Sequence, residues 1–212
     1  MTRAVLQIAA WCAAFWLALW LHAQQTRDPR ERMRFAWALG VGALLARAGH
    51  ALFWGEPHNV AEPSAAFSVL FFPLGVLWLT PHAAAFASLP LALAVARLGC
   101  IAAGCCRGAA GEPLPLFEVS AWVAVHLALA RSDPERIPER FAFAFGGLRL
   151  AEAPWRPPVG AVATPELVAL AWIAVGAWLR ARRLRESVTN GKRFPHASPH
   201  RRVRRSTRRV SW

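Results

Sequence analysis

Four residues near the middle of the chain have side chains that could do chemistry. Arg97, Cys100, Cys105 and Cys106 lie in the stretch RLGCIAAGCCRG, whose other members are mostly apolar or small. A guanidinium group can bind two phosphate oxygens at once, so Arg97 is a candidate ligand for an anion. The stretch therefore combines a permanent cation with thiols among residues that are otherwise typical of a membrane-spanning segment.

The three thiols allow more than one interpretation. Free cysteine is readily buried as a small packing residue, whereas a thiol beside a cation gains reactive thiolate character. A reversible disulfide from Cys100 to Cys105 or Cys106 is a further possibility. The cysteine and histidine spacings are not those of a zinc site, and we expect neither a metal nor a cofactor.

Two glycines flank Cys100 in the same stretch. Small residues such as Gly99 and Gly104 let helices approach closely, and a glycine turn can direct backbone N–H groups at a phosphate. The pattern is consistent with either role.

Further ionisable residues occur inside other apolar segments. Arg47 and His50 are spaced three residues apart, as are Arg149 and Glu152, so each pair shares one face of a helix. Glu118 lies in the apolar segment after the cysteines. A charge at mid-bilayer costs at least about 2.5–3.5 kcal/mol. We expect these groups to extend to the membrane surface, or to be paired around a bound anion.

The elements that must position these residues are predicted to be membrane helices. The chain has 212 residues and is 56% hydrophobic, against about 45–50% in soluble domains. A helix that spans the hydrocarbon core needs about 20 residues. The sequence predicts an all-α, polytopic integral membrane bundle of about seven transmembrane helices, built from apolar blocks at roughly 4–22, 35–54, 66–79, 83–103, 114–130, 141–152 and 164–179.

The charges of the loops predict the orientation of this bundle. Arginines gather after the first block and between the fifth and sixth, whereas segment 55–65 contains neither lysine nor arginine. Because positively charged loops stay in the cytoplasm, the N-terminus is expected outside and the C-terminus inside. All the ionisable residues named above then lie at the level of the outer leaflet, where the headgroup of a phospholipid is the natural anion.

The C-terminal segment differs in composition from the rest. Residues 180–212 hold twelve Lys or Arg and one acidic residue, and so carry most of the net charge of +13. We therefore predict a transmembrane domain at 1–180 and a basic, disordered cytoplasmic tail at 181–212. The tail is expected to rest on anionic lipid, and nucleic acid is not expected as a partner.

Three motifs resemble those of the prolipoprotein diacylglyceryl transferase family. ARLGCIAAGCCRG is similar to the signature Gly-Arg-x-Gly-Asn-Phe-x-Asn-Gly-Glu, with cysteines in place of the first Asn and of the Glu. EPLPLFE, residues 112–118, is similar to His-Pro-Ser-Gln-Leu-Tyr-Glu. GLRLAEAPWR, residues 147–156, is similar to Gly-x-x-Arg-Phe-x-x-Glu-Phe-x-Arg and is one residue shorter between its Arg and Glu.

The resemblance implies a multi-pass enzyme of the bacterial inner (plasma) membrane. Such enzymes move a diacylglyceryl group from phosphatidylglycerol to the lipobox cysteine thiol of an exported prolipoprotein. Arg97 and Arg149 would hold the phosphate, with Glu152 holding Arg149 and Glu118 orienting Arg97 or the headgroup. The remaining residues that the resemblance or their depth assigns to substrate binding are Arg47, Gly99, Cys100, Gly104, Cys105 and Arg156.

One family motif is missing, which leaves two functions open. The family has His-Gly-Gly where this chain reads SVLFFPLG, residues 68–75, with Leu70 or Phe71 at the position of the histidine. His50 is the candidate replacement as proton acceptor, and its other interpretation is an interfacial histidine. The protein is either a transferase-like enzyme or a non-catalytic, phospholipid-binding membrane protein of the same fold.

Overall fold

The computed structural model describes residues 2–54, 83–104, 108, 110–155 and 165–193, with the backbone alone described at 2–4, 45–54, 165 and 190–193. Within these ranges the chain forms helices and no strand, which confirms the predicted all-α class. The α-helices are α1 Thr2–Gln25, α2 Pro29–Trp54, α4 Ala83–Ala103, α5 Leu114–Ala130, α6 Ile137–Glu152 and α7 Pro165–Arg193. Short 3-10 turns, Pro134–Arg136 and Ala153–Trp155, lie on either side of α6.

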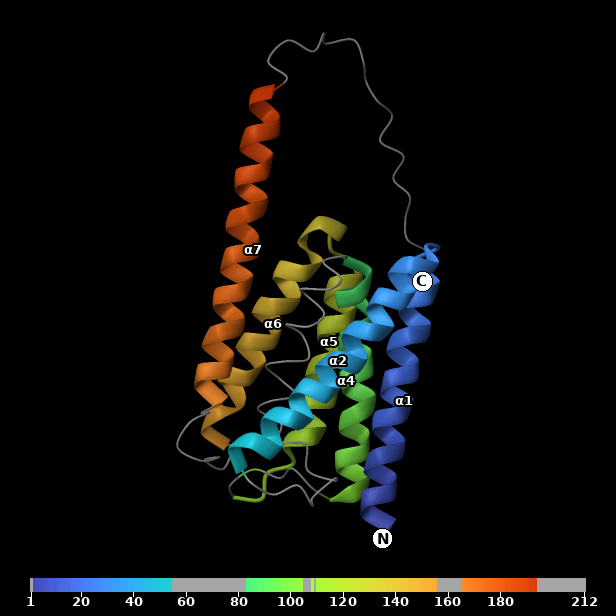
Figure 1. Ribbon diagram of the computed structural model, residues 1–212. Coiled ribbons are helices and arrows are strands. Elements are labelled where there is room, and N and C mark those ends of the chain that lie inside the picture. The colour runs from blue at the N-terminus through green and yellow to red at the C-terminus, as the bar shows by residue number, and fades with distance from the viewer. Residues whose placement is uncertain (1, 55–82, 105–107, 109, 156–164, 194–212) are drawn as a thin grey trace.

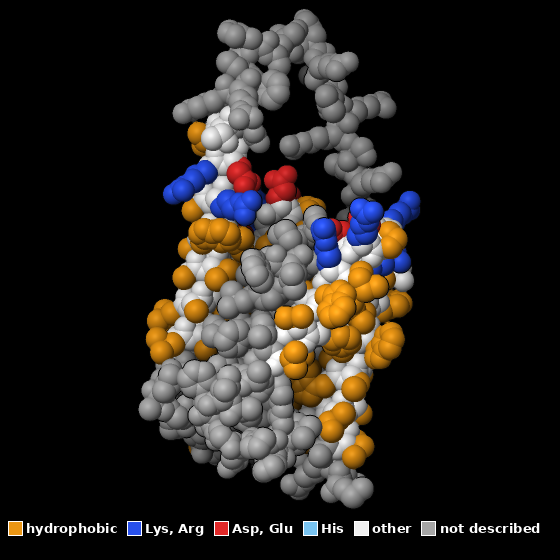
Figure 2. All heavy atoms as spheres, in the orientation of Figure 1, with side chains coloured by type: hydrophobic (Ala, Val, Ile, Leu, Met, Phe, Trp, Pro, Cys, Tyr) orange, Lys and Arg blue, Asp and Glu red, His pale blue; other side chains and the backbone are white. Residues whose placement is uncertain are grey.

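The helices lie side by side and reverse direction at each short connection (Figure 1). The link from α1 to α2 and the link from α5 to α6 lie at the same end of the molecule. The charged side chains visible in Figure 2 gather in a band at that end, above a largely apolar surface. Loop charges that are far apart in the sequence therefore come together in space.

Close packing of α1 against α4 depends on small side chains. Ala14 and Ala18 of α1, and Ala92 and Ala96 of α4, are all buried. A Cβ atom added at Gly99 would collide with the Cβ of Ala10. Of the two roles predicted for Gly99, the structure shows the one in helix packing.

An aromatic cluster holds α5, α6 and α7 together. Trp122, Phe141, Phe145 and Trp172 are each at most 1% exposed. Phe145 lies 5.2 Å from Trp122 and 5.1 Å from Trp172, measured between ring centroids. Tilted aromatic pairs at such distances contribute about 0.5–1.5 kcal/mol beyond their buried area. Its member Phe145 lies one helical turn before Arg149 on α6.

Two of the described helical segments are long and apolar enough to cross a membrane. They are Val5–Gln25 and Ala83–Ala103, and Leu114–Ala130 is a shorter apolar helix. The predicted block at 66–79 lies outside the described residues, and the blocks at 141–152 and 164–179 fall in α6 and α7. Seven membrane spans therefore remain a prediction.

The predicted start of a disordered tail at residue 181 is wrong. Helix α7 continues to Arg193, thirteen residues further, while 194–212 lie outside the described residues. Arg182 and Glu186 form an ion pair of 2.9 Å one turn apart, and the hydroxyl of Ser187 donates to the carbonyl of Leu184. Extending an existing helix costs far less than starting one, so a polar, arginine-rich sequence can continue it.

Candidate functional site

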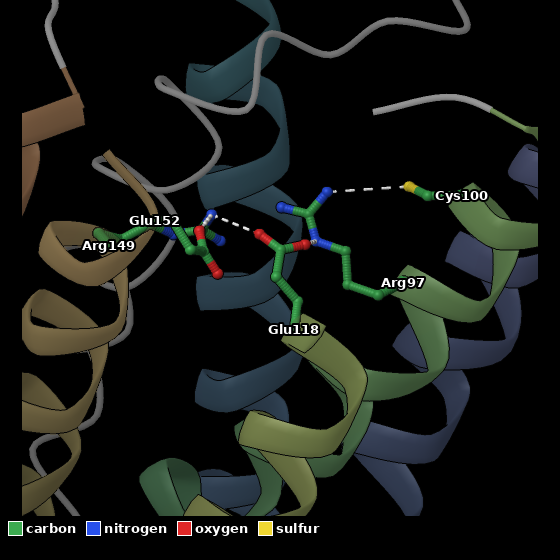
Figure 3. A network of polar contacts seen from close by, with 5 residues as sticks. All are labelled: Arg97, Cys100, Glu118, Arg149 and Glu152. Carbon is green, nitrogen blue, oxygen red and sulfur yellow. Dashed lines mark hydrogen bonds and ion pairs between the residues drawn. The ribbon is translucent and has the colours of Figure 1, made fainter. Parts of the chain in front are cut away.

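Four charged residues from three helices meet in the interior of the bundle. They are Arg97 of α4, Glu118 of α5, and Arg149 and Glu152 of α6, and we call them the arginine–glutamate cluster (Figure 3). Each residue is at most 7% exposed, and both glutamates are fully buried. Side chains of this kind are almost never buried unless they are paired.

The carboxylate of Glu118 links the two arginines. Arg97 Nε lies 2.5 Å from Glu118 Oε2, and Arg149 Nη1 lies 2.7 Å from Glu118 Oε1. Arg149 Nη1 also lies 2.9 Å from Glu152 Oε2, within the same helix. Two cations and two anions make the cluster formally neutral, so the strong Coulomb attraction inside the protein offsets part of the cost of desolvation.

The helix directions explain why these residues meet. Arg97 lies near the end of α4, Glu118 near the start of α5, and Arg149 and Glu152 in the last turn of α6. Because α4 and α6 run opposite to α5, all four fall at one level (Figure 1). The band of charged side chains in Figure 2 lies towards the other end of the molecule.

The described part of the connection between α4 and α5 contains two glycines with positive φ. Gly104 ends α4 with φ +66° and donates its N–H to the carbonyl of Ile101. Gly111, at φ +89°, donates to the carbonyl of Gly108, whose own N–H donates to the carbonyl of Glu112. These left-handed angles suit glycine. For Gly104, the described backbone shows a role in ending the helix.

Two neighbours complete the surroundings of the cluster. The guanidinium carbon of Arg149 lies 5.4 Å from the ring centroid of Phe145, within the range of a cation–π interaction. Arg97 Nη1 lies 3.8 Å from the sulfur of Cys100, which is 1% exposed. Cys100 is thus a buried thiol in contact with a cation. This surrounding is compatible with both predicted roles, a packing residue and a reactive thiol.

The structure brings together five of the residues that the sequence singled out: Arg97, Cys100, Glu118, Arg149 and Glu152. Arg47 and His50 belong to α2, but their side chains lie outside the described residues, as do Cys105, Cys106 and Arg156. Sequence reasoning missed Phe145. Its spacing of four residues from Arg149, which places both on one helix face, was the available signal.

Comparison with known proteins adds no relative to these observations. No family model, no curated protein and no solved structure matches the chain. Within the part of the chain that the structure describes, no group of three or more His, Cys, Asp or Glu could hold a metal ion.

Proposed function

We propose that the protein is a membrane-embedded transferase similar to the prolipoprotein diacylglyceryl transferases. One observation carries the proposal: residues from three separate motifs, far apart in the sequence, meet in one buried cluster. Taking charged side chains out of water is costly even when they are paired, so a bundle needs a reason to keep two buried arginines. Binding the phosphate of a lipid headgroup supplies that reason.

The proposed reaction moves a diacylglyceryl group from phosphatidylglycerol to a lipobox cysteine. The cysteine sulfur forms a bond to the glyceryl carbon that carries the phosphate, and the bond from that carbon to oxygen breaks. Glycerol-1-phosphate leaves with the bonding electrons. The thiol proton goes to the leaving phosphate or to a base, for which His50 in α2 is the candidate.

The arginines would stabilise the charge that grows on the leaving phosphate. Preorganised donors aimed at a developing oxyanion act most strongly where water is excluded. Glu118 contacts both guanidinium groups and so sets their separation before the lipid binds. In this proposal Arg97 and Arg149 bind the phosphate, while Glu118 and Glu152 are positioning residues.

A non-catalytic lipid-binding protein is the second candidate. The absence of the family's histidine near Leu70 favours it, because proton transfer then lacks its usual acceptor. The charge balance of the cluster fits this candidate equally well, because the two arginines and two glutamates neutralise one another whether or not a reaction takes place.

A transfer assay separates the two candidates. The purified full chain, in detergent micelles, is given phosphatidylglycerol with a labelled diacylglyceryl group and a lipobox peptide. Label on the peptide thiol is expected for the enzyme, and a peptide with serine in place of cysteine serves as the control. Failure to label any lipobox peptide, together with failure to complement a strain depleted of its own transferase, would favour the lipid-binding protein.

The proposed topology has seven spans, with the N-terminus outside and the C-terminus in the cytoplasm. Reporter domains fused after residue 60 and after residue 185 are expected to lie on opposite sides of the inner membrane, because the loop charges differ in sign. Alkaline phosphatase activity should appear only for the first fusion, and cytoplasmic fluorescence only for the second. Two reporters on the same side would contradict the seven-span topology.

A further inference from the structure

An exposed tryptophan on α7 precedes two arginines on the same helix face. Trp178 is 58% exposed, and Arg182 and Arg185 follow it by four and seven residues. The guanidinium carbon of Arg182 lies 5.9 Å from the centroid of the Trp178 ring. Residues at these spacings form one column along a helix.

Helix α2, which runs in the opposite direction, carries the mirrored arrangement. Trp37 is 66% exposed, and Arg34 and Arg30 precede it by three and seven residues. The side chains of Arg34 and Arg182 are both 62% exposed. Because α2 and α7 run in opposite directions (Figure 1), the arginines of both columns lie nearer than the tryptophan to the end of the molecule where α1 connects to α2.

The spacing matches the layers of a bilayer. Three or four residues of helix span about 4.5–6 Å, and each headgroup layer is roughly 5–7 Å thick. Tryptophan prefers the boundary between hydrocarbon and headgroups. With Trp37 and Trp178 at that boundary, the guanidinium groups of Arg34 and Arg182 fall among the phosphates, and those of Arg30 and Arg185 lie just beyond.

We propose that these two columns are binding sites for anionic phospholipid headgroups in the leaflet at the charged end, opposite to the level of the arginine–glutamate cluster. The proposal requires a membrane location, which the proposed function also requires, but no transferase chemistry. In each column one guanidinium group is paired with a carboxylate, Arg34 with Glu31 on α2 and Arg182 with Glu186 on α7, and Asp28 accepts a hydrogen bond from the backbone N–H of Arg30. The arginines of both ion pairs are exposed, and such pairs contribute little on their own and yield to a stronger anion.

The test compares anionic with zwitterionic lipid on the full chain. Phosphatidylserine, which is not the proposed donor lipid, is titrated into dodecylmaltoside micelles, with phosphatidylcholine of the same acyl chains as reference. The unfolding temperature is expected to rise further with phosphatidylserine. In the variant R34Q/R182Q, the phosphatidylserine concentration that gives half of this rise in unfolding temperature should increase about fivefold. This is the factor expected for the loss of one surface arginine from each site.

A matched variant removes the same charge from the same end. Arg131 and Arg136 are exposed arginines without a tryptophan column, and Arg136 pairs with Asp133 much as Arg34 pairs with Glu31. R131Q/R136Q should bind phosphatidylserine like the unchanged protein. Equal weakening in both variants, or no preference for phosphatidylserine over phosphatidylcholine, would overturn the proposal.

Two further measurements keep this test separate from the proposed function. Without added lipid, R34Q/R182Q should unfold at the same temperature as the unchanged protein, because both arginines are largely exposed. Any transfer activity should also be unchanged in this variant. A protein that transfers no lipid but loses its phosphatidylserine preference in R34Q/R182Q would support the two columns while rejecting the transferase.

Discussion

Replacing Arg97 by alanine is expected to lower the rate of diacylglyceryl transfer about 100- to 1000-fold, and Arg149→Ala by a similar factor. One preorganised donor to a developing oxyanion contributes about 2.7–4 kcal/mol to the stability of the transition state. Lysine at position 97 should restore little of the rate, because an ammonium group cannot bind two phosphate oxygens in the planar geometry of a guanidinium. The measurement is kcat/KM for transfer of labelled diacylglycerol to a lipobox peptide.

The cysteines provide the control for this prediction. The triple variant C100A/C105A/C106A should keep most of the activity if Cys100 only packs beside Arg97. Unfolding temperatures of all variants, measured in the same micelles, separate a loss of catalysis from a loss of folding. An inactive triple variant alongside a normal Arg97→Ala enzyme would reject phosphate binding by the arginines, and would assign the chemistry to the thiols.

The second large effect is expected at Glu118, and it concerns stability. Glu118→Gln leaves Arg97 and Arg149 without the carboxylate that links them, inside a bundle where both are at most 7% exposed. Breaking a buried ion pair from one side costs about 3–5 kcal/mol, because a buried charge is left uncompensated. We expect a loss of this size in the free energy of unfolding, measured by denaturant titration in micelles.

Glu139 supplies a matched control on α6. It accepts two hydrogen bonds from Arg183 of α7, at 3.0 and 3.3 Å, but the side chain of Arg183 is 26% exposed. Glu139→Gln should therefore cost less than Glu118→Gln, because water partly solvates the guanidinium group that it leaves behind. Adding Arg97→Gln to Glu118→Gln makes the cluster neutral again. The double variant should therefore lose less free energy of unfolding than the two single variants lose in sum. A loss in Glu118→Gln no larger than that in Glu139→Gln would contradict the linking role of Glu118.

Depth in the bundle could be predicted from the sequence, whereas lateral contacts could not. Loop charges and helix directions place Arg97, Glu118, Arg149 and Glu152 at one level, as the structure does. The spacing of three residues also predicted that Arg149 and Glu152 share a helix face. That Glu118 contacts both arginines depends on how α4, α5 and α6 pack around each other, and no local spacing encodes this arrangement.

The end of α7 shows where composition misleads. Residues 181–193 contain few apolar side chains, and composition alone predicts disorder for such a segment. The apolar residues before this segment already form a helix. Each further residue is added to an existing turn, which costs less free energy than starting a new helix. The ion pair between Arg182 and Glu186 adds a few tenths of a kcal/mol to that extension.

The pairing of charges within the arginine–glutamate cluster has a consequence for biosynthesis. Arg149 and Glu152 neutralise each other within α6, while Arg97 and Glu118 do so between the consecutive helices α4 and α5. In the proposed membrane topology, a nascent chain could therefore enter the bilayer as one neutral hairpin, α4–α5, followed by one neutral helix, α6. None of α4, α5 and α6 would then enter the hydrocarbon with the charge of its cluster residues uncompensated while waiting for a distant partner to be synthesised.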